Sequence, residues 1–302
     1  MRVLVTGAAG FVAKHLVPEL AAHGHEPVTT DIPPAVDMPD YTAVDLCDPE
    51  AVSALVERVR PDACIHLAGI SFVPDGDRDP GRLLAINIGG TVNLLKAFRA
   101  HAPAARFLFV STAQAYGCSL TPDAPRVTED SPTLPLSMYM ISKGACEQVV
   151  NAYGSYYGMD TLIARPANHT GPGQTPKFVV PSLVDQARRI RRGELSSFTA
   201  GNMESWRDFT DVRDVAYAYR LILEKGRRGR VYNVSAGEHV PLRDLLALIK
   251  REAGVEAPLE VNPAFVRPTD YSRVLDTTRL REELGWKPSY TLRDTIRDML
   301  AE

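Results

Sequence analysis

Three side chains that can polarise and protonate an oxygen atom lie close together in the sequence. The segment LFVSTAQAYG (108–117) ends an apolar run in hydroxyl residues, among them Thr112. The segment SMYMISK (137–143) follows and places Tyr139 and Lys143 four residues apart. Residues at this spacing share one face of a helix, so a phenol and an ammonium can act together there.

A tyrosine needs help to transfer protons at neutral pH, because its reference pKa is about 10. An ammonium about 5 Å away, at an effective dielectric of about 20, is worth roughly 3 kcal/mol, or about two pKa units. We therefore expect Lys143 to lower the pKa of Tyr139, and Thr112 to hydrogen-bond the reacting oxygen. A YxxxK pair also occurs on ordinary helices, where the tyrosine packs and the lysine points to water. The hydroxyl residues before it favour the catalytic interpretation.

A glycine turn follows the first apolar run of the chain. In TGAAGFVAKHL (6–16), Gly7 allows a tight turn and Gly10 lets the backbone approach a pyrophosphate held at a helix N-terminus. Ala13 replaces the third glycine of the usual pattern. Asp31 stands about twenty residues further on, where a carboxylate accepts hydrogen bonds from the adenosine ribose and repels a 2′-phosphate. The pattern predicts NAD(H) as the preferred cofactor and NADP(H) as the alternative.

The elements that must position these residues alternate between strand and helix. A helix is expected from Phe11 to Gly24, and another over 51–59 with Asp48 as its N-cap. Two long helices are expected at 80–101 and 137–157. Strands are expected at 2–6, 27–30, 42–44, 63–67, 106–111 and 161–165. Repeated β-α-β units predict an α/β fold of the Rossmann type, with a doubly wound parallel sheet.

The alternation stops after Asn168, where the run GPGQTP (171–176) leads into a helix over 179–192. We expect a dinucleotide-binding domain over 1–167 and a smaller, irregular α/β lobe for the substrate over 168–302. Strands near 208–234 are expected to return to the main sheet.

The composition excludes several classes of protein. The chain has 302 residues, 45% hydrophobic and 24% charged, with a formal net charge of −3. These values give no reason to expect nucleic acid or an anionic membrane as a partner. No apolar run spans a bilayer and the N-terminus does not resemble a signal peptide, so we expect a cytoplasmic protein. Cys47, Cys64, Cys118 and Cys146 lack metal-ligand spacing, and no metal is expected.

These motifs together resemble the extended short-chain dehydrogenase/reductase family, of the NAD-dependent epimerase/dehydratase type. The resemblance covers essentially the whole chain, through GAAGFVA, HLAG (66–69), NIGGTVNLL (87–95), STAQAYG, YMISK, RPANHTGPGQ (165–174), WRDFTDVRDVA (206–216), VYNVSAG (231–237) and ELGWKP (283–288). It implies an enzyme that binds NAD(P) in the N-terminal lobe and a nucleotide sugar in the C-terminal lobe. It also implies a homodimer formed through the helices near 80–101 and 137–157.

The resemblance also implies roles for individual residues. Thr112, Tyr139 and Lys143 would be catalytic, and Asn168, Val179, Arg207, Arg267 and Asp270 would bind the substrate, the two arginines by its diphosphate. The cofactor would contact Gly7, Gly10, Phe11, Val12, Asp31, Asp45, Leu46, Leu67, Ala68, Gly69, Tyr139, Lys143, Pro166 and His169.

Two features separate the activities found in this family. NHTGPGQ and GNMESWRDFTDVRD are similar to the branch that reduces GDP-6-deoxy-4-keto-D-mannose to GDP-D-rhamnose. Gln114 stands where sugar 4,6-dehydratases carry a glutamate base, and glutamine cannot act as a base. We therefore expect hydride transfer to the C4 ketone of a GDP-6-deoxy-4-keto-hexose. The alternatives are a nucleotide-sugar 4-epimerase with retained NAD, which Asp31 favours, and a cofactor-binding sensor without turnover, which the intact catalytic group disfavours.

Overall fold

The computed structural model describes residues 1–32, 40–117, 126–265 and 274–302. Its centre is a sheet of seven parallel strands in the order β10-β6-β5-β4-β1-β2-β3. These strands are β1 (Arg2–Thr6), β2 (Glu26–Asp31), β3 (Tyr41–Ala43), β4 (Ala63–His66), β5 (Arg106–Val110), β6 (Asp160–Pro166) and β10 (Val231–Val234). The expected doubly wound parallel sheet is confirmed.

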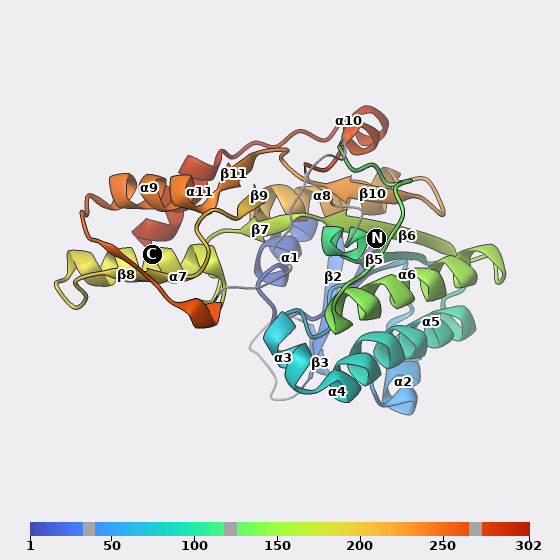
Figure 1. Cartoon of the computed structure of the whole chain (residues 1–302). Helices are drawn as coiled ribbons and strands as arrows, with labels where there is room; N and C mark the ends of the chain where they lie inside the picture. Colours follow the sequence, from blue (N-terminus) through green and yellow to red (C-terminus); the bar gives the residue numbers. More distant parts are fainter. Residues whose placement is uncertain (33–39, 118–125, 266–273) are drawn as a thin grey trace.

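Helices cover both faces of this sheet because successive strand residues point to opposite sides. In β1, Val3 and Val5 pack in one apolar cluster and Leu4 in another. The first cluster includes side chains of α1 (Ala13–Ala22), α8 (Val212–Lys225) and α10 (Thr278–Leu284). The second includes those of α2 (Pro49–Val59), α5 (Gly90–His101) and α6 (Met138–Ser155), which Figure 1 shows side by side.

Polar side chains mark where several of these helices begin. Asp48 accepts hydrogen bonds from the backbone N–H groups of Glu50 and Ala51, so the expected N-cap of α2 is confirmed. The Ser137 hydroxyl accepts one from Met140 N–H and begins α6. This cap places Tyr139 in the first turn of α6, immediately beside the end of β5.

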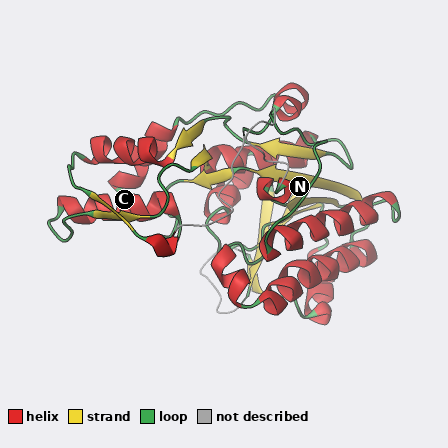
Figure 2. Cartoon of the chain, in the orientation of Figure 1, coloured by secondary structure: helices red, strands yellow, loops and turns green. Residues whose placement is uncertain are grey.

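The second lobe has its own apolar core. It consists of α7 (Val179–Arg191), α9 (Leu242–Ala253) and α11 (Leu292–Ala301), together with two small sheets. The strands are β7 (Asn168–Thr170), β8 (Phe198–Ala200), β9 (Trp206–Asp211), β11 (His239–Pro241) and β12 (Leu259–Val261). Figure 2 shows these helices grouped on the side of the molecule away from the main sheet.

Two expectations about the elements were wrong in part. The helix expected over 80–101 is divided into α4 (Pro80–Leu84), a π-helical segment η1 (Ala85–Gly89) and α5. Of the late strands, β10 joins the main sheet next to β6, whereas β9 pairs with β7 and β11 in a separate sheet. The order of apolar residues along the chain does not specify which neighbour a short strand will pair with.

Three short helices complete the fold: α3 (Val73–Arg78), η2 (Ala113–Tyr116) and η3 (Pro263–Phe265). In the described part of the chain, no helix combines the length and apolar character needed to cross a membrane.

Candidate active site

A large cavity lies between the two lobes, at the carboxyl ends of the parallel strands. Its volume is about 1440 Å³, whereas a pocket for one drug-sized ligand measures about 300–1,000 Å³. The cavity therefore has room for more than one ligand. It is lined by the described residues that the sequence nominated, namely Gly7, Gly10, Phe11, Val12, Asp31, Asp45, Leu46, Leu67, Ala68, Gly69, Thr112, Tyr139, Lys143, Pro166, Asn168, His169, Val179 and Arg207.

The glycine turn after β1 is closed tightly against the turn after β4. Gly7 has a φ of +72°, and a Cβ atom there would lie 2.7 Å from the Ala68 backbone nitrogen. No other residue type fits this position without moving the backbone. The turn leads into α1, whose N-terminus faces the cavity and suits a phosphate group. These features fit a dinucleotide.

Asp31 ends β2 and is bound to this turn. One carboxylate oxygen accepts a hydrogen bond from Ala9 N–H at 2.9 Å, and the other accepts one from Ile32 N–H at 2.7 Å. The carboxylate therefore holds the glycine turn in place and also presents a negative charge to the cavity that it lines.

The three expected catalytic residues meet at the end of β5. Thr112 follows the strand and accepts a hydrogen bond from Gln114 N–H at 3.2 Å. The Lys143 ammonium donates to the Val110 carbonyl oxygen at 2.9 Å. Tyr139, Thr112 and Lys143 are all buried, and Thr112 hydrogen-bonds the Tyr139 phenol. The phenol and a hydroxyl can thus contact the same substrate oxygen.

The expected direction of the Tyr139 pKa shift was wrong. Burial raises the pKa of Tyr139 to about 12, and the hydrogen bond from Thr112 offsets only part of that rise. Two physical reasons account for the difference. Removing a phenolate from water is costly, and the Lys143 ammonium donates to a carbonyl oxygen of β5. Tyr139 is therefore protonated at neutral pH.

A buried ion pair that was not predicted from the sequence connects α6 with β5 and β6. Glu147 lies one turn after Lys143 on α6, and its carboxylate accepts hydrogen bonds from the Arg165 guanidinium, the shortest at 2.6 Å. Glu147 also accepts a hydrogen bond from the Ser111 hydroxyl, next to Thr112. Arg165 in turn donates to the Tyr116 hydroxyl at 2.9 Å. The one feature of the sequence that could have indicated this ion pair is a glutamate four residues after Lys143, on the same face of the helix.

A second set of buried hydrogen bonds supports the turns after β1 and β4. Thr91 donates to the Asn87 carbonyl oxygen at 2.6 Å, so it accepts from His66 Nε2–H at 3.0 Å. His66 Nδ1 then accepts from the Thr6 hydroxyl at 2.7 Å. Burial lowers the pKa of His66 to about 3, so the ring is neutral. The Asn87 side chain lies in η1 and bonds Ser142 of α6 at 2.9 Å.

Residues of the second lobe, among them His169 and Arg207, also line the cavity. His169 stacks on Phe11 with ring centroids 6.3 Å apart, and burial lowers its pKa. The Arg207 guanidinium donates to the Trp206 carbonyl oxygen at 2.7 Å. Arg267 and Asp270 lie outside the described residues.

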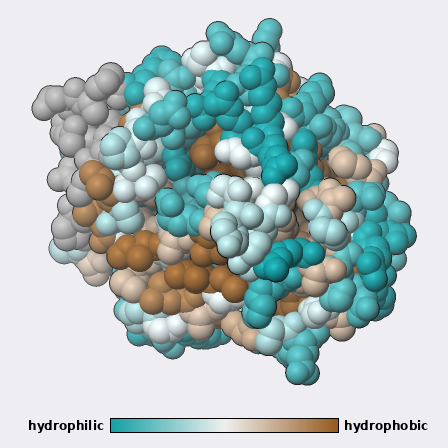
Figure 3. All heavy atoms as spheres, turned by 90° about the vertical axis from the view of Figure 1, so that its right-hand side faces the viewer, coloured by the Kyte–Doolittle hydropathy of each residue, from teal (hydrophilic) through white to brown (hydrophobic). Residues whose placement is uncertain are grey.

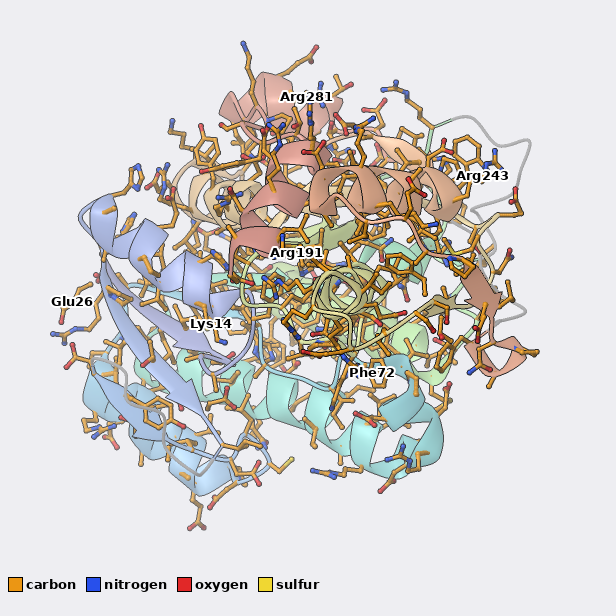
Figure 4. All side chains as sticks on the ribbon, turned by 90° about the vertical axis from the view of Figure 1, so that its left-hand side faces the viewer. Lys14, Glu26, Phe72, Arg191, Arg243 and Arg281 are labelled. Atoms are coloured by element: carbon orange, nitrogen blue, oxygen red, sulfur yellow. The ribbon has the colours of Figure 1, made fainter. Side chains whose placement is uncertain are left out.

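The two lobes touch at the edge of the cavity. Phe72 precedes α3 and meets Phe178, the residue before α7, edge to face at 5.7 Å. Figure 4 labels Phe72 at the boundary between the N-terminal helices and α7. Both rings line the cavity. Within the described parts of the chain, no group of three or more His, Cys, Asp or Glu side chains is arranged to hold a metal ion.

Comparison with known proteins gives consistent matches over the whole length. A family described as GDP-mannose 4,6 dehydratase matches residues 4–299. The GDP-6-deoxy-D-mannose reductase of Pseudomonas aeruginosa is 37% identical, over 100% of this chain and 96% of that protein. The UDP-glucose 4-epimerase of Mycolicibacterium smegmatis is 31% identical, over 98% of this chain and 96% of that protein.

Solved structures agree with this result. RMD from Pseudomonas aeruginosa complexed with NADPH has a TM-score of 0.89 and 35% identity, covering 100% of this chain and 98% of its own. The UDP-glucose 4-epimerase of Thermus thermophilus in complex with NAD has a TM-score of 0.88 and 32% identity, with the same coverage. The chain therefore belongs to the GDP-mannose 4,6 dehydratase family, within the extended short-chain dehydrogenases/reductases.

Proposed function

We propose that the protein reduces the C4 ketone of a GDP-6-deoxy-4-keto-hexose, with GDP-6-deoxy-D-mannose (GDP-D-rhamnose) as the product. The main support is the 37% identity over the whole chain to a GDP-6-deoxy-D-mannose reductase. The cavity supports the same activity, because it joins a dinucleotide turn, a buried Thr-Tyr-Lys group and space for a second ligand.

In this proposal NAD(P)H supplies the hydride to C4. The protonated Tyr139 phenol donates a proton to the C4 oxygen as that oxygen gains electron density, and the Thr112 hydroxyl donates a second hydrogen bond to it. This hydrogen bonding favours charge developing in the transition state. Lys143 keeps one hydrogen bond to the Val110 carbonyl and has two further N–H groups for the nicotinamide ribose.

The cofactor is proposed to contact the glycine turn (Gly7, Gly10), Phe11, Val12 and the strand-end residues Asp31, Asp45 and Leu46. Its nicotinamide half would contact Leu67, Ala68, Gly69, Tyr139, Lys143, Pro166 and His169. We propose NAD(H) as the preferred form, because the Asp31 carboxylate opposes a 2′-phosphate. The Pseudomonas RMD structure holds NADPH, so NADP(H) is the alternative.

The substrate is proposed to bind beyond the nicotinamide site, against Asn168, Val179 and Arg207, which line the same cavity. Arg207 would hold the diphosphate, since a guanidinium forms paired hydrogen bonds with phosphate oxygens. Arg267 and Asp270 are proposed to complete the site. On this basis residues 1–167 form the cofactor domain and residues 168–302 mainly the substrate lobe.

Dehydratase chemistry is not part of this proposal, although the family is named after it. Gln114 lines the cavity beside Thr112. An amide cannot take the C5 proton that a sugar 4,6-dehydratase must remove. GDP-mannose itself should therefore not be dehydrated.

The assay that tests the proposal supplies GDP-6-deoxy-4-keto-mannose with NADH or NADPH. We expect one reduced nicotinamide to be oxidised for each GDP-D-rhamnose formed. In parallel, GDP- and UDP-hexoses are supplied with no added cofactor. Interconversion of a hexose pair by protein carrying its own NAD, with no NADH or NADPH consumed in the first assay, would instead establish a 4-epimerase.

The protein is further proposed to act as a cytoplasmic homodimer. The helices around 80–101 and 137–157 would form the dimer interface, and α6 exposes apolar side chains there, among them Ile141. Figure 3 shows apolar residues gathered into a patch on the face that is the right-hand side of Figure 1, where α5 and α6 end.

A further inference from the structure

Within the described parts of the chain, the hydroxyl of one buried tyrosine at the cavity lacks a hydrogen-bond partner. Tyr219 lies on α8 and is completely buried, with its ring in the apolar cluster between α1, α8 and the sheet. Its hydroxyl oxygen makes no hydrogen bond to any part of the described chain. Two other buried tyrosines are paired, since Tyr116 donates to Asn233 at 2.7 Å and Tyr232 to Glu283 at 2.9 Å. A buried donor without a partner calls for an explanation.

The position of Tyr219 suggests where its partner comes from. Tyr219 lines the same cavity as Phe11, Val12, Tyr139 and Pro166, which are the residues of the proposed nicotinamide end. The Tyr219 and Tyr139 phenols also interact electrostatically. Tyr219 thus approaches the hydride-transfer region from α8, on the face of the sheet opposite α6.

The protonation state of Tyr219 makes it a donor. Burial, with a smaller contribution from the Tyr139 phenol, raises the pKa of Tyr219 well above its ordinary value. The hydroxyl keeps its proton throughout the neutral range. Ala13 belongs to the same apolar cluster as Tyr219, Val12 packs against that cluster, and both residues line the cavity. A phenylalanine would fill the same space without leaving a donor unpaired.

We propose that the Tyr219 hydroxyl donates a hydrogen bond to the nicotinamide half of the bound cofactor, with the carboxamide oxygen as its acceptor. This inference rests on the cofactor part of the proposed function. It adds a contact from α8, an element that the sequence motifs of the cofactor site do not include.

The test compares two ligands that differ only in the nicotinamide. Binding of NADH and of ADP-ribose is measured by calorimetry for the wild-type protein and for Tyr219→Phe. The variant should bind NADH about 3- to 10-fold more weakly, as expected for one neutral hydrogen bond. ADP-ribose affinity should be unchanged. If the wild type binds NADPH more tightly than NADH, the comparison is made between NADPH and 2′-phospho-ADP-ribose instead.

Tyr217→Phe is the matched control, because Tyr217 lies two residues away on α8 and does not line the cavity. Without ligand, Tyr219→Phe should unfold at the wild-type temperature or higher, since no hydrogen bond within the described chain is lost. In wild-type protein with ¹³Cζ-labelled tyrosine, the Tyr219 resonance should shift with NADH and much less with ADP-ribose.

Three results would overturn the inference. Equal weakening of both ligands would mean that Tyr219 only supports the fold. Unchanged affinity for both, or a Tyr219 resonance that responds equally to both, would mean that the nicotinamide does not reach it. If the wild-type protein bound neither ligand, the proposed function itself would be wrong. If only the Tyr219→Phe variant bound NADH more weakly, the proposed function would remain intact.

Discussion

The surroundings of Tyr139 in the folded protein have opposing effects on the pKa of its phenol. Burial disfavours the phenolate and raises the pKa to about 12, while the Thr112 hydrogen bond favours the phenolate. A ketone reductase needs the protonated form as its starting state.

Replacing Tyr139 with phenylalanine tests its role directly. We expect Tyr139→Phe to lower kcat by about 10²–10⁴-fold, because a positioned proton donor is lost. Binding of NADH should remain close to that of the wild type. Steady-state kinetics and calorimetry provide the two measurements. Near-normal turnover of the variant would mean that Tyr139 merely packs against its neighbours.

In the proposed function, one carboxylate has two roles. The charge of Asp31 would oppose a 2′-phosphate, and its carboxylate accepts a hydrogen bond from Ala9 N–H. We expect the wild type to use NADH at least about tenfold more efficiently than NADPH, from charge repulsion at short range. Asp31→Asn removes the charge and keeps one of the two acceptor oxygens that serve Ala9 N–H and Ile32 N–H, so it should reduce the preference and loosen the turn less than Asp31→Ser does.

Asp31→Ser removes both features and should reduce the preference and also weaken binding of either cofactor. Comparing kcat/KM for NADH and NADPH across the three proteins separates charge from turn geometry. Equal efficiency of the unaltered enzyme with both cofactors would contradict this role for Asp31.

The buried carboxyl of Asp208 should make stability depend on pH. Burial, together with Glu238, raises the pKa of Asp208 to about 7, although a hydrogen bond from Ser235 opposes the rise. The folded protein then holds a proton that the unfolded chain releases above about pH 4. Stability should therefore fall as the pH rises from about 4 to about 7, by up to a few kcal/mol.

Asp208→Asn should remove this part of the pH dependence, because an amide does not ionise. Urea unfolding at pH 5, 6, 7 and 8 measures it. The control is Asp244→Asn on α9, where the carboxylate is exposed. Identical pH profiles for the wild type and Asp208→Asn would show that Asp208 does not titrate in this range.

At the scale of elements, the proposed mechanism requires β5, α6 and β6 to stay aligned. Glu147 of α6 binds Ser111 after β5 and Arg165 of β6, so one carboxylate connects the parts that carry Thr112, Tyr139 and Pro166. The π-helical η1 adds a further connection, because its Asn87 side chain bonds α6 and the Ile70 backbone. Such π-helical segments often occur at functional sites.

Removing Glu147 should damage this arrangement. Glu147→Ala leaves the Arg165 guanidinium buried without its carboxylate, and we expect a loss of about 3–5 kcal/mol in unfolding free energy. Chemical denaturation measures the change. The control is Glu26→Ala, which breaks the exposed Arg2–Glu26 pair and should cost at most about 1 kcal/mol. Similar losses in the two variants would refute a special role for Glu147.

At the scale of the whole molecule, the active site exists only because two lobes face each other. The main sheet supplies the dinucleotide turn and the catalytic group, and the second lobe supplies His169, Val179 and Arg207. The Phe72–Phe178 contact joins the lobes at the cavity edge.

The proposed dimer can be tested by placing a charge on its face. Ile141 is 41% exposed on α6, and we expect Ile141→Glu to convert dimers to monomers in light-scattering measurements, since it buries an unpaired carboxylate. Val261→Glu on β12, where the side chain is 58% exposed, is the matched control and should leave the mass unchanged. A wild-type protein that is monomeric at micromolar concentration would exclude this interface.

The sequence by itself determined the features that depend on neighbouring residues. The alternation of apolar strands and helices predicted the parallel sheet, and local spacing identified Gly7, Asp31, Thr112, Tyr139 and Lys143, which line one cavity. Asp48 as an N-cap follows the same rule. These features are readable because turn, cap and helix-face geometry act over only a few residues.

Only the tertiary structure decided the features that depend on distant residues and on the exclusion of water. Glu147 meets Ser111 and Arg165 from 36 and 18 residues away. Tyr219 reaches the cavity from a helix that belongs to no cofactor motif. The pKa of Tyr139 rose where spacing alone predicted a fall, because desolvation depends on how much of the folded chain surrounds the phenol, and no short segment contains that information.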